Sequence, residues 1–275
     1  WKALLFVVGV LPLLLGLCCF KLIPESLGYM VLKKYPKHQI DKVARKIDKH
    51  IDLENVEFIL EHNKAFKTVT NPVKYILGKN YFVRTLCLWW CYSMGVYTVF
   101  LLSGWLPILI SSNGFDHTQA SIISAFFQLG GPVGCIVAGY LMDKFDRYYG
   151  LALVSLGTII SLLAAVVFEP TYLSYSIICM FIGMWAYGTN AGFYSLSSMI
   201  YPVEVRSTGV GFMNGVARLG AIASVFAGAY MLNAGFTPQA VFLSIVFPVV
   251  TMIIITVLIR PKKTATENAL LNVNA

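Results

Sequence analysis

Residues 208–232 read TGVGFMNGVARLGAIASVFAGAYML, an apolar run with a single charged side chain, that of Arg218. A helix that crosses a membrane needs ~20 predominantly apolar residues, and this run is long enough. Arginine keeps its proton in proteins, and at mid-membrane depth its charge costs at least ~2.5 kcal/mol, so the guanidinium should face a cavity or an anion. The run therefore predicts a membrane protein that handles a negatively charged solute.

The rest of the chain has the same character. Hydrophobic residues make up 57% and charged residues 12% of the sequence, which lies outside the usual range of soluble domains. Seven segments are long enough to cross a membrane as helices: residues 3–20, 85–110, 118–142, 149–168, 171–196, 208–232 and 239–259. The predicted fold class is an all-α membrane protein.

Basic residues mark one side of the membrane. Thirteen of the 21 Lys and Arg residues lie in residues 21–84, whereas the loops at 113–117, 168–171 and 233–239 contain none. By the positive-inside rule, the basic loops and the C-terminal tail are predicted to be cytoplasmic. The net charge of +8 then reflects topology, and no nucleic acid partner is expected.

Residues 27–83 form one long polar region. Ile40, Val43, Ile47 and Ile51 follow a helical spacing among charged residues, which predicts a cytoplasmic loop with a surface helix or two. Such a basic loop is either solvated or in contact with anionic lipid, and the solvated, orientation-setting interpretation is favoured.

The order of these segments predicts four parts. Residues 1–26 are a transmembrane helix, 27–83 a cytoplasmic central loop, 84–260 a six-helix transmembrane bundle and 261–275 a cytoplasmic tail. Six helices after a long basic loop are the layout of one half of a transporter built from repeats. Because the chain starts at Trp1 without an initiator methionine, we expect it to be the C-terminal part of a longer protein, with the missing N-terminal half as its partner.

Polar side chains at membrane depth are confined to a few segments. Amide or charged groups occur at four positions: Gln128, Asn190, Asn214 and Arg218. Asn214 and Arg218 are four residues apart and share a helix face, and Tyr187 lies three residues before Asn190. Segments 149–168 and 239–259 carry only Ser and Thr as polar groups, so we predict that they are peripheral.

Each candidate also has a structural interpretation. Gln128 and Asn190 fit hydrogen bonds between helices as well as they fit a cavity lining, and Trp105 is better explained as an interfacial anchor than as a ligand contact. Arg218 differs, because no Asp or Glu lies within any predicted span to pair with it. A substrate or coupling role is therefore the favoured interpretation of Arg218.

The sequence shows no arrangement of a nucleophile, base and oxyanion site, no metal-ligand cluster and no nucleotide-binding loop. All six cysteines fall within apolar segments, where thiols pack as small apolar groups. We therefore expect neither an enzyme nor a bound metal or cofactor.

Loop motifs resemble those of the major facilitator superfamily. GYLMDKFDR at 139–147 is similar to its G-x-x-x-D-[RK]-x-G-R loop, and PES at 24–26 and PVEVRSTG at 202–209 resemble motifs of its sugar and organic-ion branches. The resemblance implies a major facilitator helical bundle, in which this chain supplies the C-terminal six-helix half, the preceding helix and the central loop.

Further motifs are similar to those of one branch, the aromatic acid:proton symporters. They are Leu88-Trp89 with Tyr92, GWLP at 104–107, FQLGG at 127–131 and ARLGAI at 217–222. The sequence departs from the pattern where Asp146 replaces the loop glycine, where Tyr148 stands in place of a basic residue and where Gly28 stands in place of arginine.

This resemblance implies import of an aromatic carboxylate, such as a benzoate or hydroxybenzoate, by proton symport through alternating access. The protein would be a multi-pass protein of the cell membrane, expected to be a bacterial inner membrane. Arg218 would bind the carboxylate and Tyr92 or Tyr187 would flank the ring. Ring hydroxyls would be read by an amide group: that of Gln128, Asn190 or Asn214. The carboxylate that carries the proton would lie in the missing half.

Four charged loop residues are candidates for gating. Asp143 and Arg147, with Glu204 and Arg206 of the second loop, can form contacts that hold one face of a transporter closed and break when it opens. The alternative is an ordinary surface charge cluster, worth under ~1 kcal/mol for each exposed pair.

Three other functions are compatible with parts of the sequence. A sugar or polyol porter shares the loop motifs, but a neutral substrate gives no reason for Arg218. The same arginine disfavours an organic-cation carrier. A seven-helix receptor would also have its N-terminus outside the cell and its C-terminus inside. A receptor explains neither the long first loop nor the loop motifs.

Overall fold

The computed structural model describes residues 2–22, 25, 27–32, 35–47, 71–79 and 81–260. The described residues form helices and contain no strand, which confirms the predicted all-α class. The helices are α1 (Lys2–Leu22), α2 (Leu27–Leu32), α3 (Lys37–Ile47), α4 (Pro72–Ile76), α5 (Phe82–Ser111), α6 (His117–Lys144), α7 (Arg147–Val167), α8 (Tyr172–Ile200), α9 (Val203–Asn233) and α10 (Pro238–Leu258).

The chain divides into two compact units. Trp1–Thr68 contains α1 to α3, and Val69–Ala275 contains α4 to α10. Within the second unit α5, α6, α7, α9 and α10 are long and apolar enough to cross a membrane, and α8 has no charged side chain along its 29 residues. The protein is therefore a multi-pass membrane protein.

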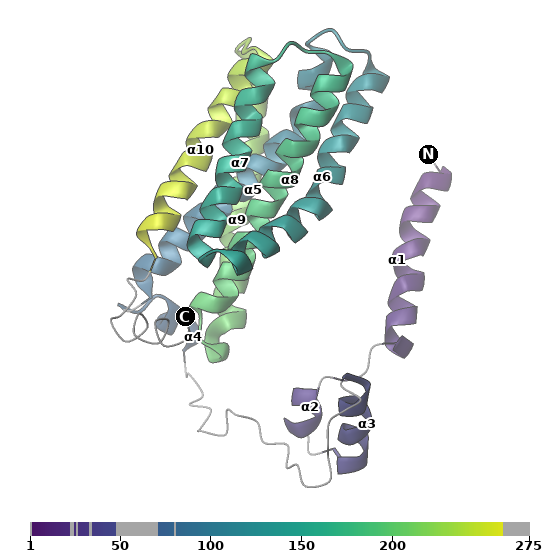
Figure 1. Ribbon diagram of the computed structural model, residues 1–275, viewed down its shortest axis with the longest axis vertical. Coiled ribbons are helices and arrows are strands. Elements are labelled where there is room, and N and C mark those ends of the chain that lie inside the picture. The colour runs from purple at the N-terminus through teal and green to yellow at the C-terminus, as the bar shows by residue number, and fades with distance from the viewer. Residues whose placement is uncertain are drawn as a thin grey trace. The chain divides into compact units, whose positions relative to one another are not determined.

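Helices α5 to α10 form a bundle joined by short loops (Figure 1). Helix α6 packs against α8, α5 packs against α9, and α10 packs against both α7 and α5. The turns after α5 and α9 contain Gly114 and Gly235 with φ angles of 93° and 75°, which glycine adopts without steric cost. Side-chain caps begin α6, at Asp116, and α8, at Thr171.

The contact between α6 and α8 is a backbone contact. A methyl group added at Gly134 of α6 would lie 2.6 Å from the carbonyl carbon of Met184, and one at Gly188 of α8 would lie 2.7 Å from the carbonyl oxygen of Gly134. Gly130 and Gly183 likewise face backbone atoms of the other helix. Small residues allow such close approach between membrane helices, and the approach fixes the side chains that flank the glycines.

Helix α4 belongs to the bundle unit, although its residues lie in the range predicted as central loop. It packs on α9. The Thr85 hydroxyl donates to the Ile76 carbonyl over 3.0 Å and accepts from the Tyr201 hydroxyl over 3.2 Å. The bonds tie the chain before α5 to the loop before α9.

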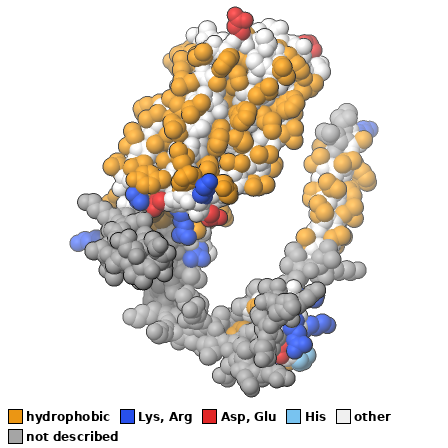
Figure 2. Space-filling model, viewed as in Figure 1, with side chains coloured by type: hydrophobic (Ala, Val, Ile, Leu, Met, Phe, Trp, Pro, Cys, Tyr) orange, Lys and Arg blue, Asp and Glu red, His pale blue; other side chains and the backbone are white. Residues whose placement is uncertain are grey.

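The surface of the bundle is largely apolar, with its charges at the ends. Figure 2 shows hydrophobic side chains over the visible face, and Lys and Arg gathered at one end. That end carries the exposed side chains of Lys144 and Arg147, whereas the opposite end carries the acids Asp116 and Glu169. This distribution suits a bundle surrounded by lipid.

Candidate functional site

The six residues predicted to bind substrate lie on four of the helices. Tyr92 is on α5, Gln128 on α6, Tyr187 and Asn190 on α8, and Asn214 and Arg218 on α9. Helices α7 and α10, which were predicted to be peripheral, contribute none of them. Within the described residues four of the six candidates form two hydrogen-bonded groups, Arg218 is an unpaired cation, and Asn190 lies apart from both groups.

The first group joins α5 to α9. The Tyr92 hydroxyl donates to Asn214 Oδ1 over 3.2 Å, and Asn214 Nδ2 donates to the Val210 carbonyl over 3.0 Å. The Tyr92 ring also lies 6.5 Å from the ring of Tyr194 on α8, with an angle of 51° between the ring planes. Tyr92 and Asn214 thus hold each other in place, with a second aromatic ring alongside.

Arg218 lies next to this group. It follows Asn214 by one helical turn, a rise of about 6 Å, and its guanidinium interacts electrostatically with the Tyr92 phenol. The side chain is exposed and makes no hydrogen bond or ion pair with any described residue. An unpaired guanidinium beside a phenol and an amide is an arrangement suited to binding a carboxylate.

The second group joins α5, α6 and α8. The Tyr187 hydroxyl donates to Gln128 Oε1 over 2.5 Å, and Gln128 Nε2 donates to the hydroxyl of Ser103 over 2.8 Å. The Tyr187 ring lies 5.5 Å from the Phe127 ring, and it packs over Gly131, where a methyl group would lie 3.0 Å from the Tyr187 ring. The group offers both hydrogen-bond donors and acceptors.

Ser103 was not among the predicted residues. A serine within a helix usually bonds back to its own backbone, so its presence alone gave no signal. The spacing of Ser103 was a usable signal, because Ser103 follows Tyr92 by 11 residues, or about three helical turns. The two residues therefore share one face of the helix.

Asn190 joins neither group. Its Nδ2 donates to the Ala186 carbonyl of the same helix over 3.2 Å, and its Oδ1 is buried without a partner among the described residues. The amide lies against α5, where a methyl group at Gly95 would be 3.0 Å from Asn190 Oδ1. This geometry is closer to the helix-packing interpretation of Asn190 than to a cavity role.

Trp105 also packs between helices. A methyl group at Gly228 of α9 would fall within 2.6 Å of the Trp105 indole, so the indole fills the space that this glycine leaves. The contact binds α5 to α9 near the end of the bundle opposite α4.

Two of the predicted gating residues share a cavity. Asp143, at the end of α6, and Arg147, at the start of α7, line a cavity of about 210 Å³ together with Ser195 of α8. Asp143 and Arg147 are exposed and form no ion pair with each other. Arg206 is partly buried, and its Nε has no partner among the described residues. The side chain of Glu204 lies outside what the structure describes.

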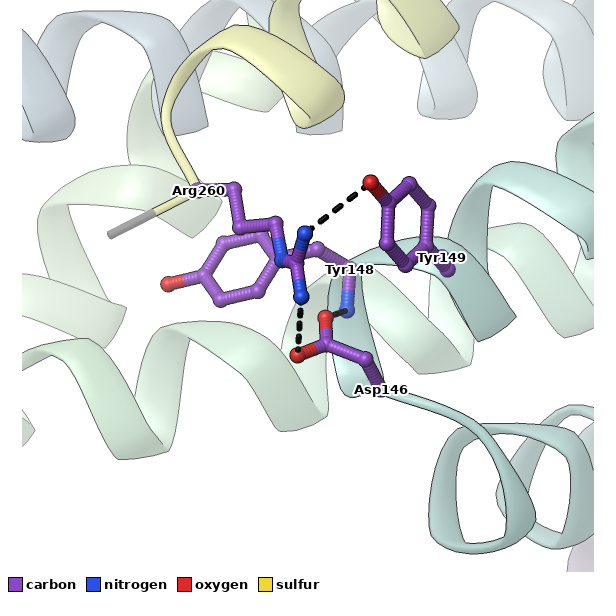
Figure 3. Close-up of polar contacts among 4 residues, drawn as sticks. All are labelled: Asp146, Tyr148, Tyr149 and Arg260. Atoms are coloured by element: carbon purple, nitrogen blue, oxygen red, sulfur yellow. Dashed lines mark hydrogen bonds and ion pairs between the residues drawn. The ribbon is translucent and has the colours of Figure 1, made fainter. Parts of the chain in front are cut away.

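A salt bridge close to this cavity was not predicted. Figure 3 shows Arg260, just beyond the end of α10, between Asp146 and Tyr149 at the start of α7. Arg260 Nη2 lies 3.2 Å from Asp146 Oδ2, Nη1 donates to the Tyr149 hydroxyl over 2.9 Å, and the guanidinium carbon lies 4.3 Å from the centre of the Tyr149 ring. Asp146 Oδ1 also accepts from the Tyr148 backbone N–H over 3.1 Å and so caps α7.

Comparison with known proteins places these features in a family context. The sequence profile of the Major Facilitator Superfamily matches residues 1–224. The chain is 30% identical over 250 residues to the 4-hydroxybenzoate transporter PcaK of Pseudomonas putida, covering 90% of this chain and 55% of the relative. It is 31% identical over 237 residues to the gallate transporter of Pseudomonas putida, covering 86% and 52%. It is 27% identical over 264 residues to the benzoate transport protein of Acinetobacter baylyi, covering 96% and 56%. The chain thus spans about half the length of these relatives.

Proposed function

Because this chain belongs to the major facilitator superfamily, whose relatives here are transporters and not enzymes, we propose that it is the C-terminal six-helix half of a secondary carrier, with the preceding helix and central loop. The substrate that we infer is an aromatic carboxylate of the benzoate or hydroxybenzoate type. The carrier imports it by proton symport through alternating access between two helix bundles.

Arg218 is the observation that carries this proposal. Its guanidinium is exposed and unpaired among the described residues, in a stretch of α9 that has no other charged side chain. A carboxylate meets the planar guanidinium with two parallel hydrogen bonds, and this pairing strengthens where water is scarce. Tyr92, held by Asn214, supplies an aromatic ring next to the carboxylate.

The group of Ser103, Gln128 and Tyr187 is suited to reading ring hydroxyls. A phenolic hydroxyl both donates and accepts, so it can insert between the Tyr187 hydroxyl and the Gln128 amide. Two of the relatives are named for 4-hydroxybenzoate and gallate, which carry ring hydroxyls, and a third is named for benzoate, which carries none. We assign Gln128 and Tyr187 to hydroxyl selection, and Asn190 to a supporting contact between helices.

Gating is assigned to Asp143, Arg147, Glu204 and Arg206. The cavity beside Asp143 and Arg147 leaves room for a side chain of the partner half to reach both charges. Such a contact closes one face of the carrier and breaks when that face opens.

The proton pathway is assigned to the N-terminal half. In the described part of α5 to α10 the acids lie at helix ends and in loops, so a carboxylate at membrane depth has to come from the other half. The basic central loop and tail are assigned to the cytoplasm by the positive-inside rule, which fits the inner membrane of a bacterium such as those of the relatives.

Uptake by cells that express the full-length carrier tests this proposal. Labelled 4-hydroxybenzoate, gallate and benzoate are supplied with and without an inward proton gradient, to the wild type and to Arg218→Ala and Arg218→Lys variants matched for membrane abundance. We expect gradient-stimulated uptake that falls at least about 30-fold in Arg218→Ala, because truncating one partner of a desolvated charge pair costs ~2–5 kcal/mol. Arg218→Lys keeps the charge but loses the paired geometry, so its loss should be intermediate.

Two results would contradict the proposal. Unchanged KM and uptake in Arg218→Ala would remove Arg218 from the substrate site. Uptake of sugars, with no uptake of any aromatic acid by carrier shown to be in the membrane, would move the protein to a different branch of the superfamily.

A further inference from the structure

Helix α3, Lys37–Ile47, in the first unit has two chemically different faces. Helix α2 packs against it, and the apolar residues Met30, Ile40 and Ala44 of this pair are 5%, 6% and 2% exposed. The Tyr35 backbone N–H, between the two helices, donates to the Met30 carbonyl over 3.0 Å. The apolar face of α3 is therefore already covered within its own unit.

The other face of α3 is basic. His38, Lys42, Arg45 and Lys46 are all exposed, and their spacing of four, seven and eight residues places them on one side of a helix. Asp41, the one acid of α3, is partly buried at the edge of this face. We call His38, Lys42, Arg45 and Lys46 the basic face.

The length of chain between α1 and α3 limits how far the basic face can lie from a bilayer. Helix α1 ends at Leu22 and α3 begins at Lys37, so 14 residues separate them, a reach of at most about 50 Å even when fully extended. The apolar part of α1 is Leu5–Cys19, which we have assigned to the membrane. Helix α3 can therefore reach the headgroup region next to the end of α1.

We propose that the basic face of α3 docks onto the headgroups of anionic phospholipids in the leaflet next to the end of α1. Each Lys or Arg near an anionic surface favours the bound state by roughly a factor of five. Because Ile40 and Ala44 are buried against α2, docking depends on charge and not on insertion of apolar side chains. It should therefore weaken sharply as salt shortens the Debye length from about 8 Å at 0.15 M to about 3 Å at 1 M.

This inference rests on the proposed membrane position of α1 and is independent of the substrate. In a nanodisc both leaflets have the same lipid composition, so the orientation of the chain does not affect the outcome. Failure of lipid docking and failure of transport are therefore separate results.

The test is backbone hydrogen exchange of residues 37–47 in the full chain, reconstituted in nanodiscs of phosphatidylcholine alone or with added phosphatidylglycerol. We expect slower exchange in the anionic discs at low salt and no difference between the two lipids at 1 M salt. A triple variant with Lys42→Gln, Arg45→Gln and Lys46→Gln removes three charges from the basic face. The docking equilibrium should then shift toward the undocked state by roughly a hundredfold, and exchange should no longer depend on the lipid.

Two variants control for fold and net charge. The first control makes the same change in charge on exposed residues of the second unit, with Lys74→Gln, Lys79→Gln and Lys144→Gln. Residues 37–47 of this variant should still exchange more slowly in the anionic discs. Lys42→Arg with Lys46→Arg preserves the charge of the basic face and should also keep this difference. If the triple glutamine variant exchanges faster in neutral discs as well, α3 has lost its fold, and the test then uses Lys42→Gln alone, for which we expect about a fivefold weakening.

Equal exchange in neutral and anionic discs would overturn the proposal. So would protection that depends on the basic face but is the same in both lipids, since the face would then contact an acidic protein surface.

Discussion

Gly134→Ala tests whether the backbone contact between α6 and α8 holds the bundle together. The new methyl group would meet the carbonyl oxygen of Met184 first, and it would lie 2.6 Å and 2.9 Å from the carbonyl carbon and Cα of that residue. Carbon atoms pack at ~3.5–4.0 Å, so α8 has to retreat by at least about 1 Å. The three nearest atoms belong to the backbone of Met184, so no change of rotamer can relieve the overlap.

The free energy of unfolding should fall by a modest amount. Overpacking of this kind costs ~1–3 kcal/mol, and a gap of ~0.5–1 Å forfeits a quarter to a half of the dispersion energy of each facing atom pair. Gly183 and Gly188 of α8 also face backbone atoms of α6 at close range, so the interface separates as a unit and the cost lies toward the upper value. Replacing glycine by alanine within a helix returns ~0.5–1 kcal/mol, which leaves a net loss of about 2 kcal/mol.

Thermal melting in detergent, followed by tryptophan fluorescence, measures this loss. Trp185 is on α8 itself, where its indole packs against Gly157. At about 2–4 °C for each kcal/mol, Tm should fall by roughly 4–8 °C. The matched control is Gly104→Ala on α5, where a methyl group meets nothing within 4 Å, and its Tm should stay the same or rise. A Gly134→Ala variant as stable as Gly104→Ala would refute the argument that the two backbones are in contact.

Three further predictions concern single side chains. Asp146→Asn keeps an acceptor for the cap of α7 but removes the ion pair with Arg260, so the free energy of unfolding should fall by under ~1 kcal/mol. Asp146→Ala also removes the cap and should cost ~1 kcal/mol more. Chemical denaturation measures both losses. Tyr187→Phe removes the donor to Gln128, so KM for 4-hydroxybenzoate should rise ~5–10-fold in uptake assays with little change for benzoate. The backbone N–H of Thr118 donates to the Asp116 carboxylate and lowers its pKa. The stability that this ionised carboxylate contributes is therefore complete above the ordinary pKa range of aspartate and is lost as pH falls through the lowered pKa. Asp116→Asn should remove that part of the pH dependence of Tm.

The positions of the helices could be predicted because the membrane leaves little choice. Backbone polar groups in lipid have to bond within their own helix, so an apolar run of sufficient length reports a helix directly. The run at 208–232 corresponds to α9, Val203–Asn233. The helix begins earlier than the run because a helical turn containing Arg206 can continue beyond the apolar region, where side chains reach water.

The side-chain partners could not be predicted in the same way. Asp146 was interpreted only as a departure from a loop pattern, since its partner Arg260 lies 114 residues away in the chain and becomes a neighbour only when α10 packs on α7. Asn190 was an equal candidate for packing and for binding. Its buried oxygen against Gly95 depends on how closely α8 approaches α5, which helical periodicity does not specify.

The two hydrogen-bonded groups are held by tightly packed helices, but Gln128 on α6 and Arg218 on α9 are both exposed. In this chain alone the guanidinium therefore meets a carboxylate in water, where a charge pair at 4 Å gains about 1 kcal/mol, compared with about 4 kcal/mol at the effective dielectric constant of ~20 near a protein surface. We thus expect this chain in nanodiscs to bind 4-hydroxybenzoate roughly a hundredfold more weakly than the full-length carrier, by isothermal titration calorimetry. Equal affinity of the two would mean that the described helices enclose the site by themselves, and that the partner half serves gating and proton binding only.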